Sequence, residues 1–415
     1  MWYNVGMNIA ILGYGKEGQS VEQYFQKLGE HTQVFSDFIP ADLSNFHLET
    51  FDMIFRSPSV PPQTGAEWSS ITKFFFDNCP CQIIGVTGTK GKGTTCSFIK
   101  AILESLDRKV WLVGNIGTPA LDILDQIQPD DVVVYELSSF QLWDLKESPH
   151  VAVVLRVEPD HLNVHKDFAD YVAAKSNIAK HQTAEDFCVY YGSNATSREI
   201  AALSLAHKIN YSAEPLPDEI LDSIAIPGAH NRENATAALC AVASFYGMSP
   251  AEFSAQYNSE IKRGLASFKG LPHRLEFLRE LNGVKYYDDN FSTTLPSTRV
   301  AVQAFPDNNV VLIVGGRDKT DYADLPELAD FLAQSQNITK VVLIGESGHE
   351  LAVKFPNAKF ILAENLAEAT QKAREIAESL DSAIVLMSPA AASFDMFENV
   401  YDRGAKYQEI IKGLQ

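Results

Sequence analysis

Residues 85–95 read Gly-Val-Thr-Gly-Thr-Lys-Gly-Lys-Gly-Thr-Thr, and this stretch decides the fold of the 415-residue chain. An apolar run precedes it and an amphipathic run follows it, which predicts a strand, a glycine-rich turn and a helix. Glycines let successive backbone N–H groups face one anion, and the helix N-terminus adds positive potential. Lys92 supplies a cation for the β- and γ-phosphates, and Thr94 is the nearest hydroxyl for Mg²⁺. The stretch therefore predicts binding of ATP or GTP, with a purely structural turn as the alternative.

The composition is that of a globular and strongly acidic chain. Hydrophobic residues make up 46% and charged residues 21%, and 53 acidic against 34 basic residues leave a net charge of −19. The length exceeds what one hydrophobic core usually organises, so several domains are expected. A negative field repels nucleic acid and anionic membranes, so neither is an expected partner. An anionic small substrate would need local cations, for which the candidates are Lys92, Lys175, Arg274 and Lys319.

The lack of a membrane-spanning or signal-peptide pattern favours a cytoplasmic protein, and the cysteine spacing agrees with this expectation. No apolar run approaches the ~20 residues that a membrane span needs, and the first residues do not form a signal-peptide pattern. The five cysteines are too few and too scattered for a disulfide framework. Cys79-Pro80-Cys81 has no second cysteine pair to complete a zinc site. We therefore expect buried or idle thiols.

Strand and helix patterns alternate along the chain, and the expected strands are apolar on both faces, as in parallel sheets covered by helices. The first strand is expected at residues 8–12 and leads into Gly-Tyr-Gly-Lys-Glu-Gly at 13–18. Such a turn presents N–H groups to a diphosphate, with Gly13 and Tyr14 as candidate contacts. Nucleotide binding and a purely structural tight turn are equally good interpretations. Asp37 is only a loose candidate for a ribose contact.

Two clusters of turn residues divide the chain. They are Asp-Asn-Cys-Pro at 77–80 and Lys-Gly-Leu-Pro at 269–272. We expect an α/β protein of three domains: a Rossmann-like domain at 1–80, a central P-loop ATPase-type domain at 81–270 and a second Rossmann-like domain at 271–415. The strands expected in the last domain are 284–287, 310–314, 340–344, 359–362 and 383–386.

Polar residues follow two expected strands of the central domain. Glu136 comes directly after the strand at 131–135, and His161 lies downstream of the strand at 151–155. Ligands of α/β sheets gather at this carboxyl edge, so Glu136 is a candidate Mg²⁺ ligand and His161 a candidate ligand of a second cation. A solvated glutamate and a loop histidine are the alternatives. Lys175 lies in an expected helix, where by itself it would be a surface residue.

Several further motifs make the chain resemble the Mur ligase family over nearly its whole length. Beside the phosphate loop, these are Gly-Asn-Ile-Gly (114–117), Glu-Leu-Ser-Ser-Phe-Gln-Leu (136–142), Asp-His-Leu (160–162), Ala-Ala-Lys (173–175), Gly-Ala-His-Asn (228–231) with Asn234, Gly-Leu-Pro-His-Arg (270–274), Gly-Gly (315–316) and Ser-Pro-Ala-Ala-Ala-Ser-Phe-Asp (388–395). Each motif alone is a modest signal, whereas their order and spacing are specific. The last motif and the Phe-Gln of the Glu136 motif favour the glutamate-adding branch.

The resemblance implies an ATP-dependent amide ligase that adds D-glutamate to UDP-N-acetylmuramoyl-L-alanine in cytoplasmic peptidoglycan precursor synthesis. ATP would phosphorylate the acceptor carboxylate, and the glutamate amine would attack the resulting acyl phosphate. Two Mg²⁺ ions would offset the charge repulsion, with Thr94 and Glu136 serving one ion and His161 the other. Lys175 would be carbamylated and act as a metal ligand. Lys92, Glu136, His161 and Lys175 would be the catalytic residues, and a monomer is expected.

The resemblance also implies the binding residues. The ATP contacts would be Gly88, Thr89, Lys90, Gly91, Lys92, Gly93, Thr94, Thr95, Asn231, Asn234, Arg274 and Asp289. The substrate contacts would be Gly13, Tyr14, Asn115, Ser138, Gln141, Thr293, Lys319 and Ser393. The first domain would receive the UDP, and the last three of these residues would hold the glutamate carboxylates.

Four positions depart from the family pattern, namely Ser59, Arg156, Phe291 and Val400. Phe291 replaces a lysine, and an aromatic ring cannot donate to a carboxylate, so the amino-acid pocket is the part most affected. The alternatives are a ligase that adds L-glutamate, one with another acceptor such as a folylpolyglutamate synthase, and a non-catalytic nucleotide-binding protein. The glycine pattern at 13–18 alone would also suit a dinucleotide oxidoreductase.

Overall fold

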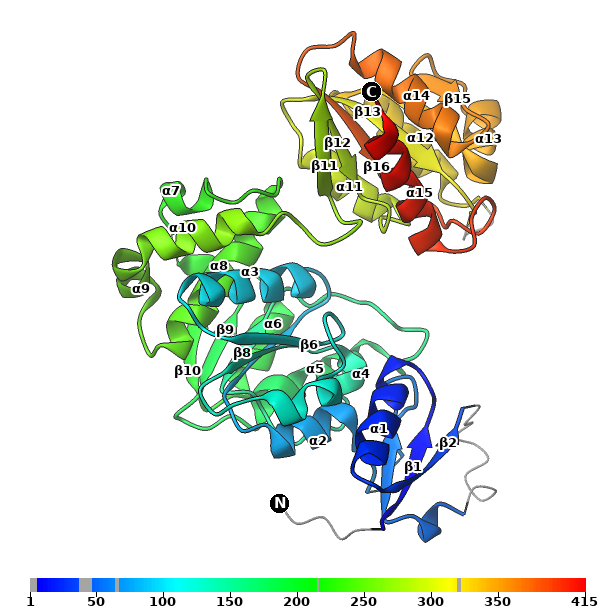
Figure 1. Ribbon diagram of the computed structural model, residues 1–415. Helices are drawn as coiled ribbons and strands as arrows, with labels where there is room; N and C mark the ends of the chain where they lie inside the picture. The colour runs from blue at the N-terminus through cyan, green and yellow to red at the C-terminus, as the bar shows by residue number, and fades with distance from the viewer. Residues whose placement is uncertain (1–5, 37–46, 64–66, 215, 319–321) are drawn as a thin grey trace. The chain divides into compact units, whose positions relative to one another are not determined.

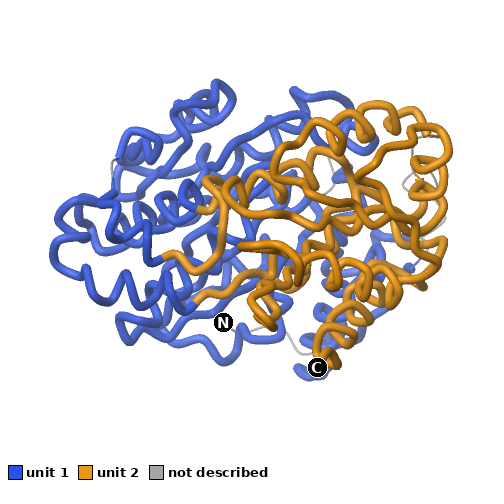
Figure 2. Tube along the Cα trace, turned by 90° about the horizontal axis from the view of Figure 1, so that it is seen from above, with its two compact units in different colours: residues 1–223, 232–267 blue, residues 224–231, 268–415 orange. Residues whose placement is uncertain are grey.

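The computed structural model describes residues 6–36, 47–63, 67–214, 216–318 and 322–415 (Figure 1). The chain forms two compact units, each described by itself below (Figure 2). The first unit is Met1–Ser223 with Arg232–Ser267, and the second is Ile224–Asn231 with Phe268–Gln415. Among the described residues, no helix combines the length and apolar character that crossing a bilayer requires.

The first unit begins with a small parallel sheet of order β2-β1-β3-β4. Its elements are β1 (Asn8–Leu12), α1 (Lys16–Lys27), β2 (His31–Phe35), η2 (Leu48–Thr50), β3 (Met53–Arg56), β4 (Ser69–Ser70) and α2 (Ile71–Asn78). One face of the sheet packs on α1 and α2 through aromatic rings, with Phe25 against both Phe55 and Phe74. The chain then continues directly into the second sheet.

The second sheet of this unit has six parallel strands in the order β10-β9-β8-β5-β7-β6. The strands are β5 (Ile83–Thr87), β6 (Val110–Gly114), β7 (Val132–Glu136), β8 (Val151–Val154), β9 (Phe187–Tyr190) and β10 (His207–Asn210). The longer helices are α3 (Lys92–Ser105), α5 (Phe168–Lys180), α6 (Ala195–Ala202), α8 (Ala229–Phe245), α9 (Pro250–Gln256) and α10 (Asn258–Ser267). Because β5 lies between β7 and β8, the strand order reverses there, and ligands of such sheets bind beyond the carboxyl end of the switch strand.

The second unit holds a six-stranded sheet of order β11-β12-β16-β13-β14-β15. Its strands are β11 (Glu276–Leu281), β12 (Val284–Asp288), β13 (Asn309–Gly315), β14 (Ile338–Ile344), β15 (Phe360–Leu362) and β16 (Ala383–Met387). Its helices are α11 (Leu295–Gln303), α12 (Leu325–Gln334), α13 (Gly345–Lys354), α14 (Leu366–Ala377) and α15 (Val400–Gly413). One hydrophobic core contains side chains of α11, α12 and α13 and the other those of α14 and α15, so both faces of the sheet are covered.

The predicted fold class is confirmed, because three sheets built from alternating strands and helices are present. β1 has the bounds predicted for it. The predictions missed β11, which pairs antiparallel with β12. Asn282 and Gly283 join the two strands, both with positive φ (52° and 79°), and an Asn-Gly pair between apolar runs is a strong hairpin signal. Domain limits at residues 80 and 270 stay a prediction.

Candidate active site

The phosphate loop joins β5 to α3 at the switch point of the central sheet. Gly88 (φ +152°) and Gly91 (φ +86°) take backbone conformations that other residues rarely adopt. A Cβ at Gly88 would lie 2.7 Å from Leu155 Cβ, and one at Gly91 would lie 2.5 Å from Asn234 Oδ1. The loop therefore requires glycine at both positions. Its geometry leaves backbone N–H groups at the N-terminus of α3 for an anion.

The other residues predicted to bind ATP phosphates lie around this loop. The Lys92 ammonium donates back to the carbonyl oxygens of Gly88 (3.1 Å) and Thr89 (3.2 Å). Thr95 Oγ1 donates to Asn234 Oδ1 (3.4 Å), which brings α8 to the start of α3. Gly93 and Thr94 lie in the first turn of α3 and are half-buried, whereas Lys90 is exposed beside Asp160. The structure thus brings this group of predicted residues together.

Glu136 ends β7, next to the strand that leads into the phosphate loop. Glu136 is only 5% exposed. One carboxylate oxygen accepts a hydrogen bond from Asn115 Nδ2 (2.9 Å), and the Asn115 N–H donates to the Glu136 carbonyl (3.1 Å). The loop after β6 therefore fixes the orientation of the carboxylate. The predicted acceptor contact Asn115 and the predicted metal ligand Glu136 are direct neighbours.

Lys175 is buried, contrary to what its residue type alone suggests. It is 1% exposed, and its ammonium donates to the Gly88 carbonyl (2.9 Å) and to Thr87 Oγ1 (3.3 Å). The same nitrogen lies 4.7 Å from the ring centroid of Tyr171, one turn earlier in α5. Burial, together with the charge of Lys92, holds the pKa of Lys175 well below its usual range. A lysine in such surroundings favours its neutral amine, which is the nucleophilic form.

The two histidines after β8 differ in environment. His161 has a positive φ of 55° and a half-exposed ring, and burial, with the charges of Lys92 and Lys175, lowers its pKa. His165 is buried and bonds Ser139 Oγ and Asp170 Oδ2, each at 2.9 Å. His161 therefore presents a ring that favours the neutral, metal-binding form. The hydrogen bonds of His165 connect the loop after β8 to Ser139 and to α5.

The acceptor side of the predicted site lies within the first unit. Ser138 caps the short helix α4 (Ser139–Leu142), and its N–H and hydroxyl both donate to Gln141 Oε1 at 2.9 Å. Gln141 Nε2 donates to Oε1 of Glu17 (2.6 Å), which belongs to the glycine-rich motif at 13–18 and lies in the first turn of α1. Gly13, in the same motif, accepts from Ser57 Oγ (2.7 Å) and has a φ of +82°. The sequence motif at 13–18 and the motif at 136–142 are therefore in contact.

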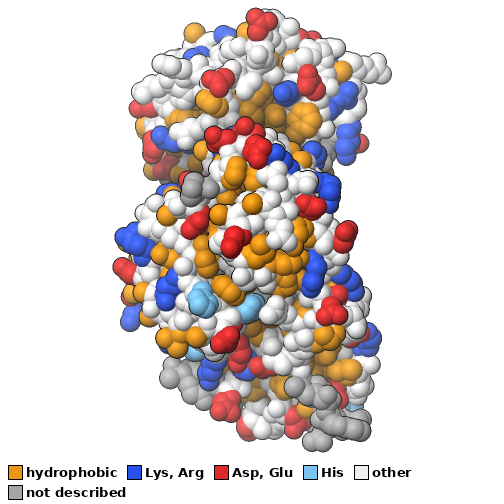
Figure 3. Space-filling model, turned by 90° about the vertical axis from the view of Figure 1, so that its left-hand side faces the viewer, with side chains coloured by type: hydrophobic (Ala, Val, Ile, Leu, Met, Phe, Trp, Pro, Cys, Tyr) orange, Lys and Arg blue, Asp and Glu red, His pale blue; other side chains and the backbone are white. Residues whose placement is uncertain are grey.

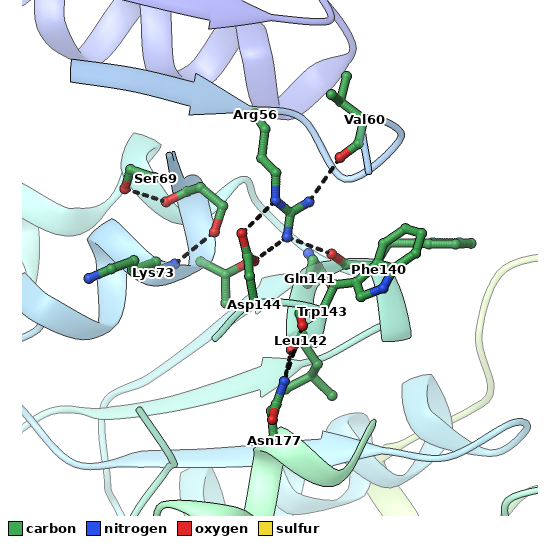
Figure 4. Close-up of polar contacts among 12 residues, drawn as sticks. Arg56, Val60, Ser69, Lys73, Phe140, Gln141, Leu142, Trp143, Asp144 and Asn177 are labelled. Atoms are coloured by element: carbon green, nitrogen blue, oxygen red, sulfur yellow. Dashed lines mark hydrogen bonds and ion pairs between the residues drawn. The ribbon is translucent and has the colours of Figure 1, made fainter. Parts of the chain in front are cut away.

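A buried arginine also links the first sheet to the motif at 136–142 (Figure 4). The Arg56 side chain, at the end of β3, is fully buried and forms a two-point ion pair with Asp144, one bond of which is 2.8 Å long. It also donates to the carbonyl oxygens of Phe140 (3.2 Å) and Val60 (3.3 Å). Asn177 of α5 donates to the Leu142 carbonyl (2.8 Å) from the other side. These bonds fix the backbone that carries Ser138 and Gln141.

The second unit carries the remaining predicted residues. Asp289 follows β12, is buried, and accepts hydrogen bonds from Ser388 Oγ (2.7 Å) and the Leu275 N–H (3.2 Å). Burial raises its pKa to about 7. The exposed Arg274 places its guanidinium 5.6 Å from the Phe291 ring centroid. Ser393 is 1% exposed, and its hydroxyl has no hydrogen-bond partner among the described residues.

The other predicted positions are placed as follows. Asn231 is buried and donates to the Pro227 carbonyl (2.6 Å), Thr293 is half-buried, and the exposed Tyr14 donates to Glu22. Lys319 and Asp37 lie outside the described residues. His273, Glu276 and Asp288 form a separate group whose ligand atoms lie within 4.8 Å of one another. Gln408 donates to both carboxylates of that group and His273 pairs with Asp288 (2.6 Å), so its polar atoms already satisfy one another.

Sequence reasoning missed three residues that position the site. Glu17 and Arg56 act across stretches of more than 80 residues, and no local pattern reveals such a contact. Tyr171 lies in the expected helix that carries Lys175. Its hydroxyl lies 3.1 Å from Thr89 Oγ1 in the phosphate loop. The signal for Tyr171 was its spacing, since it lies four residues before Lys175 and so shares its helix face.

Comparison with known proteins identifies the family. The model of the Mur ligase middle domain matches residues 86–220, and that of the Mur ligase glutamate ligase domain matches residues 273–390. The UDP-N-acetylmuramoylalanine–D-glutamate ligase of Clostridium kluyveri is 33% identical over 98% of this chain and 96% of its own length. The chain belongs to the Mur ligase family. A second relative of the same name, from Acetivibrio thermocellus, is 32% identical over the same shares.

Solved Mur ligase structures share the fold. MurF from Acinetobacter baumannii superposes with a TM-score of 0.60 at 18% identity, covering 88% of each chain. The UDP-N-acetylmuramate–alanine ligase MurC of Thermotoga maritima gives a TM-score of 0.58 at 16% identity, covering 98% of this chain and 99% of its own. The family resemblance seen in the motifs is thus confirmed, and this Mur ligase is an ATP-dependent ligase.

Proposed function

We propose that this Mur ligase joins D-glutamate to UDP-N-acetylmuramoyl-L-alanine at the expense of ATP, in peptidoglycan precursor synthesis. The most similar relatives reported above carry that activity in their names. The reaction would proceed through an acyl phosphate of the acceptor carboxylate. Attack of the glutamate amine on the acyl carbon would expel phosphate and form the amide.

The burial of Lys175 against the phosphate loop is the observation that carries the proposal. A structural lysine this deeply buried is normally paired with a carboxylate, whereas the ammonium here bonds a backbone carbonyl and a threonine hydroxyl. A neutral amine at this position can attack CO₂ and release a proton, which leaves a carbamate anion. The modified side chain then offers oxygen ligands beside the nucleotide phosphates.

The donor set near the loop fits Mg²⁺. The Glu136 carboxylate is buried and already oriented by Asn115, the Thr94 hydroxyl lies in the first turn of α3, and a carbamate on Lys175 would add oxygen ligands of the kind Mg²⁺ prefers. His161 would serve a second ion with its neutral ring. Bound there, Mg²⁺ would neutralise phosphate charge and polarise the γ-phosphoryl group.

Charge neutralisation at the loop is the main task of the protein groups. Transfer of a phosphoryl group to a carboxylate brings two anions together, which is unfavourable without compensating charge. Lys92 is held over the loop by the carbonyl oxygens of Gly88 and Thr89. The loop N–H groups and this ammonium therefore favour the phosphates, while α4 and its contacts with the first sheet orient the acceptor.

The amino-acid site is proposed in the second unit, where Ser393 offers a buried hydroxyl. Thr293 is the matched second contact, and Lys319 is the predicted cation for a glutamate carboxylate. Phe291 packs edge-to-face against Tyr401 (centroids 5.3 Å apart) and lies beneath Arg274, so a cation is supplied next to the position where the family has lysine. An L-glutamate-adding ligase is the alternative that Phe291 favours.

The test of the proposed function is phosphate release from ATP with UDP-N-acetylmuramoyl-L-alanine and either D-glutamate, L-glutamate or no amino acid. Mass spectrometry identifies the product. An amide formed with D-glutamate alone supports the proposal. An amide with L-glutamate alone would replace the assigned stereochemistry, and no amide with either would overturn the assigned substrates.

A further inference from the structure

Two thiols meet at the connection between the first and second sheets. Cys79 directly follows α2, and Cys81 lies two residues before β5. Their Sγ atoms are 3.8 Å apart, and the Cys79 thiol lies 3.6 Å from the Cys81 carbonyl oxygen, to which it donates. Both side chains are partly exposed, whereas the other three cysteines are buried: Cys96, Cys188 and Cys240. Reagents in solution therefore reach this pair and not the remaining thiols.

The backbone between the two thiols is restrained. The ring of Pro80 fixes its own φ and keeps the preceding residue in the extended region, where Cys79 lies at φ −68° and ψ 122°. The Cys79 N–H is held by the Phe75 carbonyl (2.8 Å) at the end of α2. Because a disulfide needs an S–S distance of about 2.05 Å, the sulfur atoms must approach by about 1.8 Å. The two sulfur atoms are therefore close neighbours in the reduced protein.

The surroundings assign different roles to the two sulfur atoms. The hydrogen bond between the thiols lowers the pKa of Cys79. The same bond, with burial and the charge of Asp131, raises the pKa of Cys81. Cys79 is therefore the group that ionises first and attacks. Once Cys79 is in a mixed disulfide, it no longer raises the pKa of Cys81, so the second thiol ionises more readily and completes the exchange.

We propose that Cys79 and Cys81 form a thiol–disulfide exchange site that takes low-molecular-weight disulfides. The Cys79 thiolate attacks one sulfur of the disulfide, the S–S bond of the reagent breaks, and one thiolate leaves with the bonding electron pair. The Cys81 thiolate then attacks Cys79 Sγ and expels the second thiolate. Two protein thiols are oxidised, one disulfide is reduced to two thiols, and the protons of Cys79 and Cys81 pass to the released thiolates.

The position of the bond gives it a structural consequence. The closed ring would contain Pro80 and lie between α2, which packs on the first sheet, and β5, which leads into the phosphate loop. Oxidation would therefore restrain the chain that connects the predicted acceptor domain to the nucleotide-binding sheet. The inference is independent of which substrates the ligase uses.

Oxidised glutathione is the probe for the test, applied to the full-length protein after reduction and removal of the reductant. Intact-mass and peptide-mass measurements should show loss of two hydrogen atoms within the peptide that contains Cys79 and Cys81, reversed by a thiol reductant. Cys81→Ser should stop at a single glutathione adduct on Cys79. In the wild type, a limiting amount of an alkylating reagent should label Cys79 at least about tenfold faster than Cys81. Cys188→Ser is the matched control and should behave as the wild type.

Three outcomes would overturn the proposal. In the first, the wild-type protein keeps a glutathione adduct without closing the internal bond. In the second, the wild type forms neither an adduct nor the internal bond under conditions in which Cys81→Ser becomes glutathionylated. The third is equal alkylation of Cys79 and Cys81 in the wild type. Alkylation of the wild type before and after oxidation gives a second readout that needs no substitution, since only the closed pair should be protected.

Discussion

At the scale of single residues, a chain of contacts around the phosphate loop explains the proposed chemistry. Asn115 orients Glu136, Lys92 lies over the loop carbonyls, and Lys175 is buried against Gly88. The sequence alone predicted Glu136 and Lys92 as site residues, whereas the role of Lys175 came only from the family resemblance. Lysine is normally exposed, and nothing in its neighbours along the chain signals burial.

Substitution of Lys175 tests the carbamate. Lys175→Met keeps most of the buried volume but cannot react with CO₂, so we expect the rate of phosphate release to fall by at least ~100-fold. Labelled bicarbonate should give a carbamate signal in the carbon NMR spectrum of the wild type that the variant lacks. Lys180→Met, at the exposed last turn of the same helix, should retain near wild-type activity. Full activity in Lys175→Met would remove the carbamate from the account.

The Asn115 contact tests the proposed magnesium ligand. Asn115→Ala removes the donor that orients the Glu136 carboxylate, so we expect the Mg²⁺ concentration for half-maximal activity to rise about tenfold. Thr118→Ala changes an exposed residue of the same loop and serves as the control. A Mg²⁺ titration of phosphate release measures both variants. An unchanged Mg²⁺ requirement in Asn115→Ala would place the ion elsewhere.

At the scale of secondary structure, the contacts of α4 join the two sheets of the first unit. Arg56 reaches this helix from the end of β3, and Glu17 reaches it from the first turn of α1. Apolar strands with helices between them made the strands of the second unit predictable, and in that unit only β11 was missed. These long-range polar contacts were not predictable, because Glu17 and Gln141 are 124 residues apart and depend on how the sheets pack.

Removal of the Asp144 charge should destabilise the first unit. Asp144→Asn leaves the buried guanidinium of Arg56 without its anion, at a cost of about 2–3 kcal/mol in the free energy of unfolding. Glu104→Gln disrupts an exposed ion pair with Lys100 and should cost only a few tenths of a kcal/mol. All four tryptophans lie within the first 143 residues, so tryptophan fluorescence during urea unfolding reports on this unit. Equal effects of the two variants would show that the buried pair contributes little.

Glu17 gives the first unit a pH-dependent stability. Burial raises its pKa from 4.5 to about 7, against the opposing effects of Gln141 and Arg56. Between these values the folded state keeps a proton that the unfolded state has released, so stability falls as the pH rises from about 4.5 to 7. Glu17→Gln removes this loss. As the pH rises from 5 to 8, we expect the free energy of unfolding of Glu17→Gln to increase by on the order of 2 kcal/mol relative to that of the wild type. Urea unfolding at the two pH values measures this difference. The exposed control Glu199→Gln should show no such increase.

At the scale of the whole molecule, the net charge of −19 coexists with anionic substrates. On the face shown in Figure 3, acidic and basic side chains are interspersed. Positive charge is instead supplied locally, by Lys92 and by the N-terminus of α3 at the phosphate loop. The composition indicated that an anionic substrate would need local cations, whereas the proposed place of binding comes from the loop and not from the composition. Which glutamate isomer is used was not predictable, because Phe291 departs from the family pattern and Lys319 lies outside the described residues.

Transfer of heavy oxygen from the acceptor tests the central claim most directly. UDP-N-acetylmuramoyl-L-alanine labelled in the alanine carboxylate is incubated with ATP, Mg²⁺ and D-glutamate, and the released phosphate and the amide product are both weighed. An acyl phosphate passes one labelled oxygen to inorganic phosphate for each amide formed, and this is the result we expect. Unlabelled phosphate, or labelled acceptor recovered without an amide, would contradict ligation through the buried site at the phosphate loop.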